Sequence, residues 1–108
     1  MTDDPVSVYL REVSVVAPLT DEEACEFLSA WPISEVAKQR LVEGSLCQVV
    51  SIARGFESSG KPILDLITEG NVGLLTAVET VSASERTHFS HYVRECVEQQ
   101  IRRFIAGA

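Results

Sequence analysis

The chain has 108 residues, 45% of them hydrophobic, and a formal net charge of −7, which fits one globular domain. No stretch approaches the roughly 20 apolar residues that cross a bilayer, and the acidic start lacks the pattern of a secretion signal. We therefore expect a cytoplasmic protein without membrane contact. Cys25, Cys47 and Cys96 have no metal-ligand spacing, so no metal site and no cofactor is expected.

Apolar residues recur at helical spacing along almost the whole chain, which predicts an all-α bundle of about five helices. The first helix begins at Asp4-Pro5, an acidic cap followed by a proline, and runs to about Val13. Thr20 and Glu23 form a capping box that opens the second helix, and this helix ends before Pro32.

The third predicted helix is the longest and runs from Ser34 to about Phe56. Residues 58–62 form a loop by composition. The fourth helix follows this loop and continues to about Val81.

The last predicted helix begins near Phe89, after a polar connection over residues 82–88. Its apolar stripe consists of Phe89, Val93, Val97, Ile101 and Phe104 or Ile105. We divide the chain into an N-terminal helical arm, residues 1–33, and a helical domain, residues 34–108, which form one compact unit.

Two glycines stand three residues apart inside the fourth helix, at Gly70 and Gly73. Each costs about 1 kcal/mol relative to alanine in a helix interior, a cost that a chain accepts where a backbone or partner must come close. The flanking Asp65, Glu69 and Asn71 add acidic and amide groups, so we interpret the segment as a docking surface. The alternative interpretation is that the glycines merely permit tight helix packing.

No enzyme signature is present, and catalysis is not expected. The two glycines lie in a helix without a following lysine, so they form no phosphate-binding loop. His88 and His91 have no further ligand at metal spacing. Charge is more informative, because residues 86–108 hold four arginines and two glutamates while the rest of the chain is acidic. Only the last helix therefore offers a basic face, and a weak one.

Three blocks follow one another along the chain: Ala37 to Arg54, Leu64 to Glu79, and Phe89-Ser90-His91-Tyr92 with Gln99, Ile101-Arg102-Arg103 and Ile105-Ala106. In this order they resemble region 2 of bacterial sigma-70 family transcription initiation factors. Upstream, Asp4-Pro5-Val6 and Tyr9-Leu10-Arg11-Glu12 are similar to region 1.2 of the same family. The resemblance thus covers nearly the whole chain and implies a region 2-like helical fold with a region 1.2-like arm.

The resemblance implies that the fourth helix binds a coiled coil in the clamp of the largest subunit of core RNA polymerase. The residues that match the docking positions are Leu64, Asp65, Thr68, Glu69, Asn71 and Leu75. Helical spacing independently puts Asp65, Thr68, Glu69, Val72, Leu75 and Thr76 on one face, opposite Ile67, Leu74 and Val78. The family usually has a glutamine where Thr68 stands.

The resemblance also implies that the last helix contacts the minus-ten promoter element. The matching residues are Phe89, Tyr92, Gln99, Arg102 and Arg103. Glu95 and Cys96 stand where the family typically has a tryptophan pair, and Glu98 replaces an arginine. Compared with the family, this chain therefore lacks two aromatic side chains on which bases stack, and it has two carboxylates on a face that meets phosphates. We expect weak DNA binding by the isolated chain.

The leading interpretation is a transcription initiation factor domain that binds core RNA polymerase and promoter DNA. The alternative is a degenerate sigma-like regulator, which occupies the polymerase or captures an anti-sigma factor with little ability to melt DNA. Glu95, Cys96, Glu98 and the acidic balance favour this alternative. A small-molecule binder or enzyme is the weakest interpretation, because no convergent polar residues support it.

Overall fold

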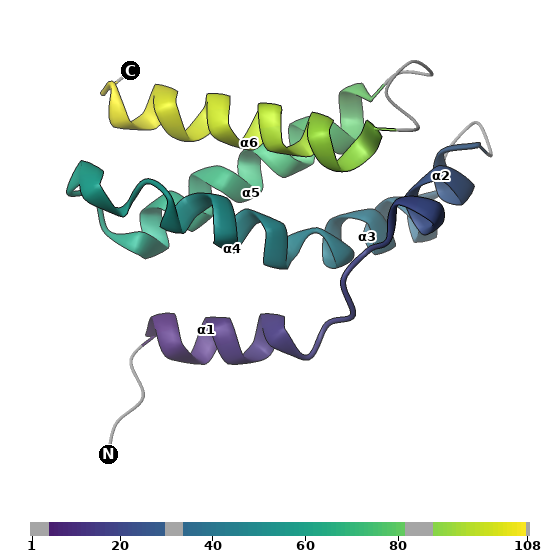
Figure 1. Cartoon of the computed structure of the whole chain (residues 1–108), viewed down its shortest axis with the longest axis horizontal. Helices are drawn as coiled ribbons and strands as arrows, with labels where there is room; N and C mark the ends of the chain where they lie inside the picture. The colour runs from purple at the N-terminus through teal and green to yellow at the C-terminus, as the bar shows by residue number, and fades with distance from the viewer. Residues whose placement is uncertain (1–4, 30–33, 82–87, 108) are drawn as a thin grey trace.

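The computed structural model describes residues 5–29, 34–81 and 88–107 (Figure 1). In that part of the chain the backbone forms six α-helices and one short 3₁₀ helix, without a β-strand. The elements are α1 (Pro5–Ser14), α2 (Asp21–Ser29), α3 (Glu35–Gly44), α4 (Leu46–Arg54), η1 (Glu57–Ser59), α5 (Ile63–Thr80) and α6 (Phe89–Ile105). The predicted all-α bundle is confirmed.

The helices α5 and α6 form the centre of the bundle and share its most extensive contact. Helix α4 packs against both of them, and α1 lies along α4 (Figure 1). Helix α2 contacts α3 and α6, so both N-terminal helices pack on the same core. The proposed division after residue 33 stays a prediction, because residues 30–33 lie outside the described part.

The centre of the core consists of one apolar stripe on each of the two central helices, and buried residues of α2, α3 and α4 pack against them. The stripe of α5 consists of Leu66, Ile67, Leu74, Ala77 and Val78, and the stripe of α6 consists of Phe89, Val93, Val97 and Ile101. Residues four apart lie on one helix face, so the α6 stripe stays against its neighbours along most of the helix. Burial of each large apolar side chain contributes about 1.5–3 kcal/mol.

Polar caps start α2 and α3 where the sequence predicts them. The Glu23 N–H donates to Thr20 Oγ1 at 3.1 Å, and the Thr20 N–H donates to Glu23 Oε1 at 3.3 Å, which confirms the capping box. Ser34 Oγ accepts a backbone N–H from the first turn of α3 at 3.1 Å. The predicted Asp4 cap and the helix end before Pro32 lie outside the described residues.

The prediction of one long third helix is wrong, because the chain breaks at Ser45 into α3 and α4. Ser45 is buried, with φ −101° and ψ −2°. The Leu19 N–H donates to the Gly44 carbonyl oxygen at 2.9 Å, and a Cβ on Gly44 would lie only 2.6 Å from Leu19 Cβ. The segment that leads into α2 therefore crosses the chain at the break, where glycine leaves it room.

Both glycines of α5 face the interior rather than a partner. A Cβ on Gly73 would lie 2.7 Å from the Cys96 carbonyl oxygen and 2.8 Å from Val97 Cα, so the backbones of α5 and α6 touch there. A Cβ on Gly70 would lie 2.7 Å from Val49 Cγ1 on α4. The glycines themselves therefore serve tight helix packing, and docking through the exposed residues of the same segment stays a prediction.

Gly73→Ala should lower the free energy of unfolding by about 1–3 kcal/mol, because the added methyl meets backbone atoms of α6 that no rotamer change can move. Gly70→Ala is the matched control and should cost less, since its closest obstacle is a side-chain methyl of Val49. Urea denaturation of both variants measures the difference. Equal stability of Gly73→Ala and the wild type would contradict the close helix contact.

Glu23 also links α2 to α3, because its Oε2 lies 3.3 Å from Arg40 Nη2. The backbone hydrogen bond from Thr20, and then the charge of Arg40, hold the pKa of Glu23 below its ordinary value of 4.5, while partial desolvation acts the other way. A carboxyl with a lowered pKa stabilises the fold above its unfolded-state pKa, and this stability is lost as the pH falls through the folded-state pKa.

Glu23→Gln should therefore lower the thermal unfolding midpoint at neutral pH and make the midpoint fall less steeply below about pH 4.5. Thermal melts by circular dichroism from neutral to acidic pH measure both effects. Glu22→Gln, which removes the neighbouring exposed carboxyl, is the matched control. A Glu23→Gln profile that runs parallel to the wild type would contradict the assignment.

Candidate functional site

The outward surface of α5 carries most of the residues that the sequence selects for docking. We define the outer α5 face by six residues, which are Asp65, Thr68, Glu69, Val72, Leu75 and Thr76. Glu69 is partly exposed and the others are exposed, with 42% of Val72 and 53% of Leu75 accessible. Ile67, Leu74 and Val78 are buried on the opposite side. The helical spacing therefore gave the correct division of α5 into two faces.

The threonine hydroxyls of this face are used within the helix. Thr68 Oγ1 donates to the Leu64 carbonyl oxygen at 2.8 Å, and Thr76 Oγ1 donates to the Val72 carbonyl oxygen at 3.1 Å. The strong polar contacts of the face are left to its carboxylates, Asp65 and Glu69.

One edge of the outer α5 face is joined to α6. The Gln100 Nε2 donates to Glu69 Oε1 at 2.9 Å. Because a carboxylate has two oxygens, this bond fixes the side chain and leaves Oε2 available for a cation. At the far end of the same seam, the hydroxyl oxygens of Thr80 and Tyr92 lie 2.6 Å apart.

The opposite edge of α5 is joined to α1. The Asn71 Nδ2 donates to the Tyr9 hydroxyl at 3.3 Å, while Asn71 Oδ1 is buried without a partner among the described residues. Exchange of the two amide ends would let the Tyr9 hydroxyl donate to Oδ1 instead. In either orientation the amide points toward α1, so Asn71 lies at the margin of the outer α5 face. Leu64 is partly buried.

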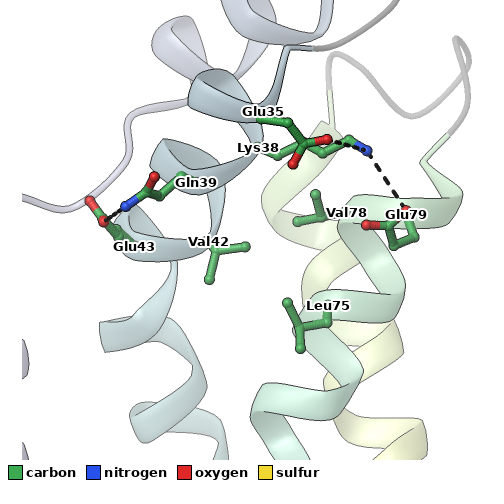
Figure 2. A pocket seen from close by; sticks show the side chains of 8 residues that line it. All are labelled: Glu35, Lys38, Gln39, Val42, Glu43, Leu75, Val78 and Glu79. Carbon is green, nitrogen blue, oxygen red and sulfur yellow. Dashed lines mark hydrogen bonds and ion pairs between the residues drawn. The ribbon is translucent and has the colours of Figure 1, made fainter.

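A groove of about 470 Å³ lies between α3 and α5 (Figure 2). Its apolar residues are Val42, Leu75 and Val78, and its polar residues are Glu35, Lys38, Gln39, Glu43 and Glu79. Lys38 Nζ lies 3.7 Å from Glu35 Oε1 and 3.8 Å from Glu79 Oε2, so it spans the top of the groove. Leu75 belongs to both surfaces, which makes the groove a continuation of the outer α5 face.

The residues expected to contact DNA are not equally accessible on α6. Gln99, Arg102 and Arg103 are exposed, whereas Tyr92 is half-buried beside Thr80. Phe89 is 2% exposed and packs in the core. Its place on the apolar stripe is therefore confirmed, while its contact with DNA stays a prediction that would need the ring to leave the core.

The two carboxylates of α6 are paired along the helix. His91 Nε2 lies 2.8 Å from Glu95 Oε1, a pair that is ionic only when the imidazole is protonated. Glu98 lies between two arginines: its Oε2 is 3.0 Å from Arg102 Nη2 and its Oε1 is 3.6 Å from Arg94 Nη1. The Arg102 guanidinium also lies 5.5 Å from the centre of the Phe56 ring.

The described residues offer little for other kinds of site. No group of three His, Cys, Asp or Glu side chains among them is arranged to hold a metal ion. None of the helices in the described ranges combines the length and hydrophobicity needed to cross a membrane.

The sequence missed the α3 side of the groove and the role of Gln100. Lys38 and Val42 are more than thirty residues from Leu75 along the chain, so no local spacing joins them. Gln100 follows Gln99 on α6, and no motif or spacing in the sequence distinguishes it. Neither the α3 side of the groove nor the Gln100 contact could be predicted, because both depend on how helices pack against one another and not on the sequence of a single helix.

An all-α bundle with an acidic and apolar α5 face and an arginine-bearing α6 is the arrangement that the resemblance implied. The family model for sigma-70 region 2 matches residues 41–108, and the chain belongs to this family. The RNA polymerase sigma factor SigA of Lactococcus lactis subsp. cremoris is 40% identical over 108 residues, an alignment that covers 96% of this chain. The chain spans about 30% of the length of that relative.

Proposed function

We propose that the chain acts in transcription initiation by binding core RNA polymerase, with the outer α5 face against the clamp coiled coil of the largest subunit. The observation that carries the proposal is the pairing of acidic and apolar groups on one exposed surface. Asp65 and Glu69 lie beside Val72 and Leu75, which are among the most exposed large hydrophobic residues of α5. Such a surface suits a helix that presents arginines next to apolar side chains.

The groove between α3 and α5 extends this surface. Its apolar floor can take one large side chain of the same partner helix, as in other helix-in-groove complexes. The carboxylates of Glu35, Glu43 and Glu79 at its rim favour a basic partner. Membership of the sigma-70 region 2 family supports this assignment. Binding to the polymerase would also place the chain in the cytoplasm.

Promoter contact is the second part of the proposal. Tyr92, Gln99 and Arg103 are spaced along one face of α6 at i, i+7 and i+11, which suits a nucleic-acid strand that runs along the helix. Glu95 lies on the same face and opposes phosphate. We therefore propose that this contact with the minus-ten element is weak in the isolated chain.

A second candidate function is that of a sigma-like regulator that occupies the polymerase, or binds an anti-sigma factor, and opens little DNA. Three observations favour it. The Tyr92 hydroxyl is engaged by Thr80, the Phe89 ring is buried, and Glu98 pairs with two of the α6 arginines. A regulator that occupies the polymerase would use the same outer α5 face as the initiation factor and would differ from it only in what α6 does.

Glu69→Lys should weaken binding to the polymerase clamp coiled coil by about tenfold or more, since it places a like charge where we expect a partner arginine. Glu57→Lys makes the same charge change on the exposed η1 helix and serves as the matched control. Titration of each variant against the labelled coiled-coil fragment measures the affinity. Equal affinities for the two variants would refute docking through the outer α5 face.

A forked promoter duplex with a minus-ten element separates the two candidates. The initiation candidate predicts that core polymerase and the chain together retain this duplex, and that a scrambled minus-ten sequence is retained less. The regulator candidate predicts that the chain binds the polymerase but adds no retention of the duplex. Failure to bind the polymerase in either assay would exclude the initiation candidate and the regulator that occupies the polymerase, and would leave only binding of an anti-sigma factor.

A further inference from the structure

Three side chains on α6 form one ionic network around Glu98. The Glu98 side chain is only 23% exposed, whereas Arg94 and Arg102 are 54% and 65% exposed. The three residues are spaced four apart, so both guanidiniums reach the carboxylate from neighbouring turns. The ring of Phe56 beyond α4 further holds Arg102 on this side of the helix. The carboxylate is thus the inner member of the network.

A carboxylate between two guanidiniums occupies the place that phosphate oxygens take in a protein–nucleic acid contact. Glu98 takes up part of the charge and of the N–H donors of each arginine, so a nucleic-acid strand competes with Glu98 for both guanidiniums. An ion pair at a helix surface adds little to the stability of a fold, so the network is not needed to hold α6 in place. Its larger effect is on what the arginines are free to bind.

We propose that Glu98 is an intramolecular competitor of the nucleic-acid backbone, which masks a phosphodiester-binding pair formed by Arg94 and Arg102. The proposal deepens the promoter-contact part of the proposed function, and it does not depend on polymerase docking. Removal of the Glu98 charge unmasks two arginines that lie two turns apart on α6, one on each side of Glu98. Each phosphate that they then neutralise releases counterions, so the gain in affinity depends on salt.

Glu95 provides a matched comparison on the same helix. Its carboxylate is 62% exposed and pairs with His91. Glu95→Gln and Glu98→Gln therefore make the same change in net charge, but only the second removes a carboxylate that contacts arginines. A general electrostatic effect would raise DNA binding alike in both variants. Competition for the arginines would raise it mainly in Glu98→Gln.

Binding of a short fluorescein-labelled oligothymidylate to the full chain, followed by anisotropy between about 50 and 200 mM salt, tests the proposal. At the lowest salt, Glu98→Gln should bind about tenfold more tightly than the wild type, and its log–log salt slope should be steeper by about 0.7 for each phosphate gained. Glu95→Gln should gain less than about threefold without a steeper slope. Equal gains for the two variants would overturn the proposal.

Two further measurements keep the result specific. Glu98→Gln in an Arg94→Gln/Arg102→Gln background should lose its gain, and a gain that persists there would refute the masking of these arginines. Glu98→Asp keeps the charge but withdraws the carboxylate from the arginines, so its gain in oligothymidylate affinity should be smaller than that of Glu98→Gln. If neither Glu98 variant gains affinity, the proposal is also overturned. Thermal melts check folding, and binding to the polymerase coiled coil should be unchanged by Glu98→Gln.

Discussion

The close approach of α5 and α6 at Gly73 is the constraint on which the rest of the bundle depends. A side chain at this position would meet the α6 backbone at the Cys96 carbonyl oxygen and Val97 Cα. The cost of a glycine inside a helix is offset here by contact between two helix backbones, which brings both apolar stripes into one core. Helix α4 can then pack across both, with Val49 against Gly70.

The same contact sets the positions of both candidate interfaces. Hydrogen bonds lie on either side of Gly73 along the seam, between Glu69 and Gln100 at one end and between Thr80 and Tyr92 at the other. One partner in each pair belongs to a proposed polymerase or DNA contact. Because both pairs span the two central helices, the proposed polymerase-binding and DNA-binding surfaces share one rigid support.

Local signals in the sequence were enough to predict most of the helix boundaries and the two faces of α5. The capping box of Thr20 and Glu23 is one example, since all of its atoms lie within four residues. The break at Ser45 could not be predicted, because it depends on Leu19 crossing the chain. The inward direction of the glycines and the groove beside Leu75 likewise depend on packing between distant segments.

The separation of α6 into a buried and an exposed side has a consequence for how such a domain can diverge. Phe89, Val93, Val97 and Ile101 specify the architecture, and all four are hidden from solvent. Glu95, Gln99 and Arg103 are accessible and add little to the core. Substitutions on the accessible side can therefore change the chemistry that α6 offers to a ligand while the bundle keeps its shape. Architecture and recognition are separately adjustable on a single helix.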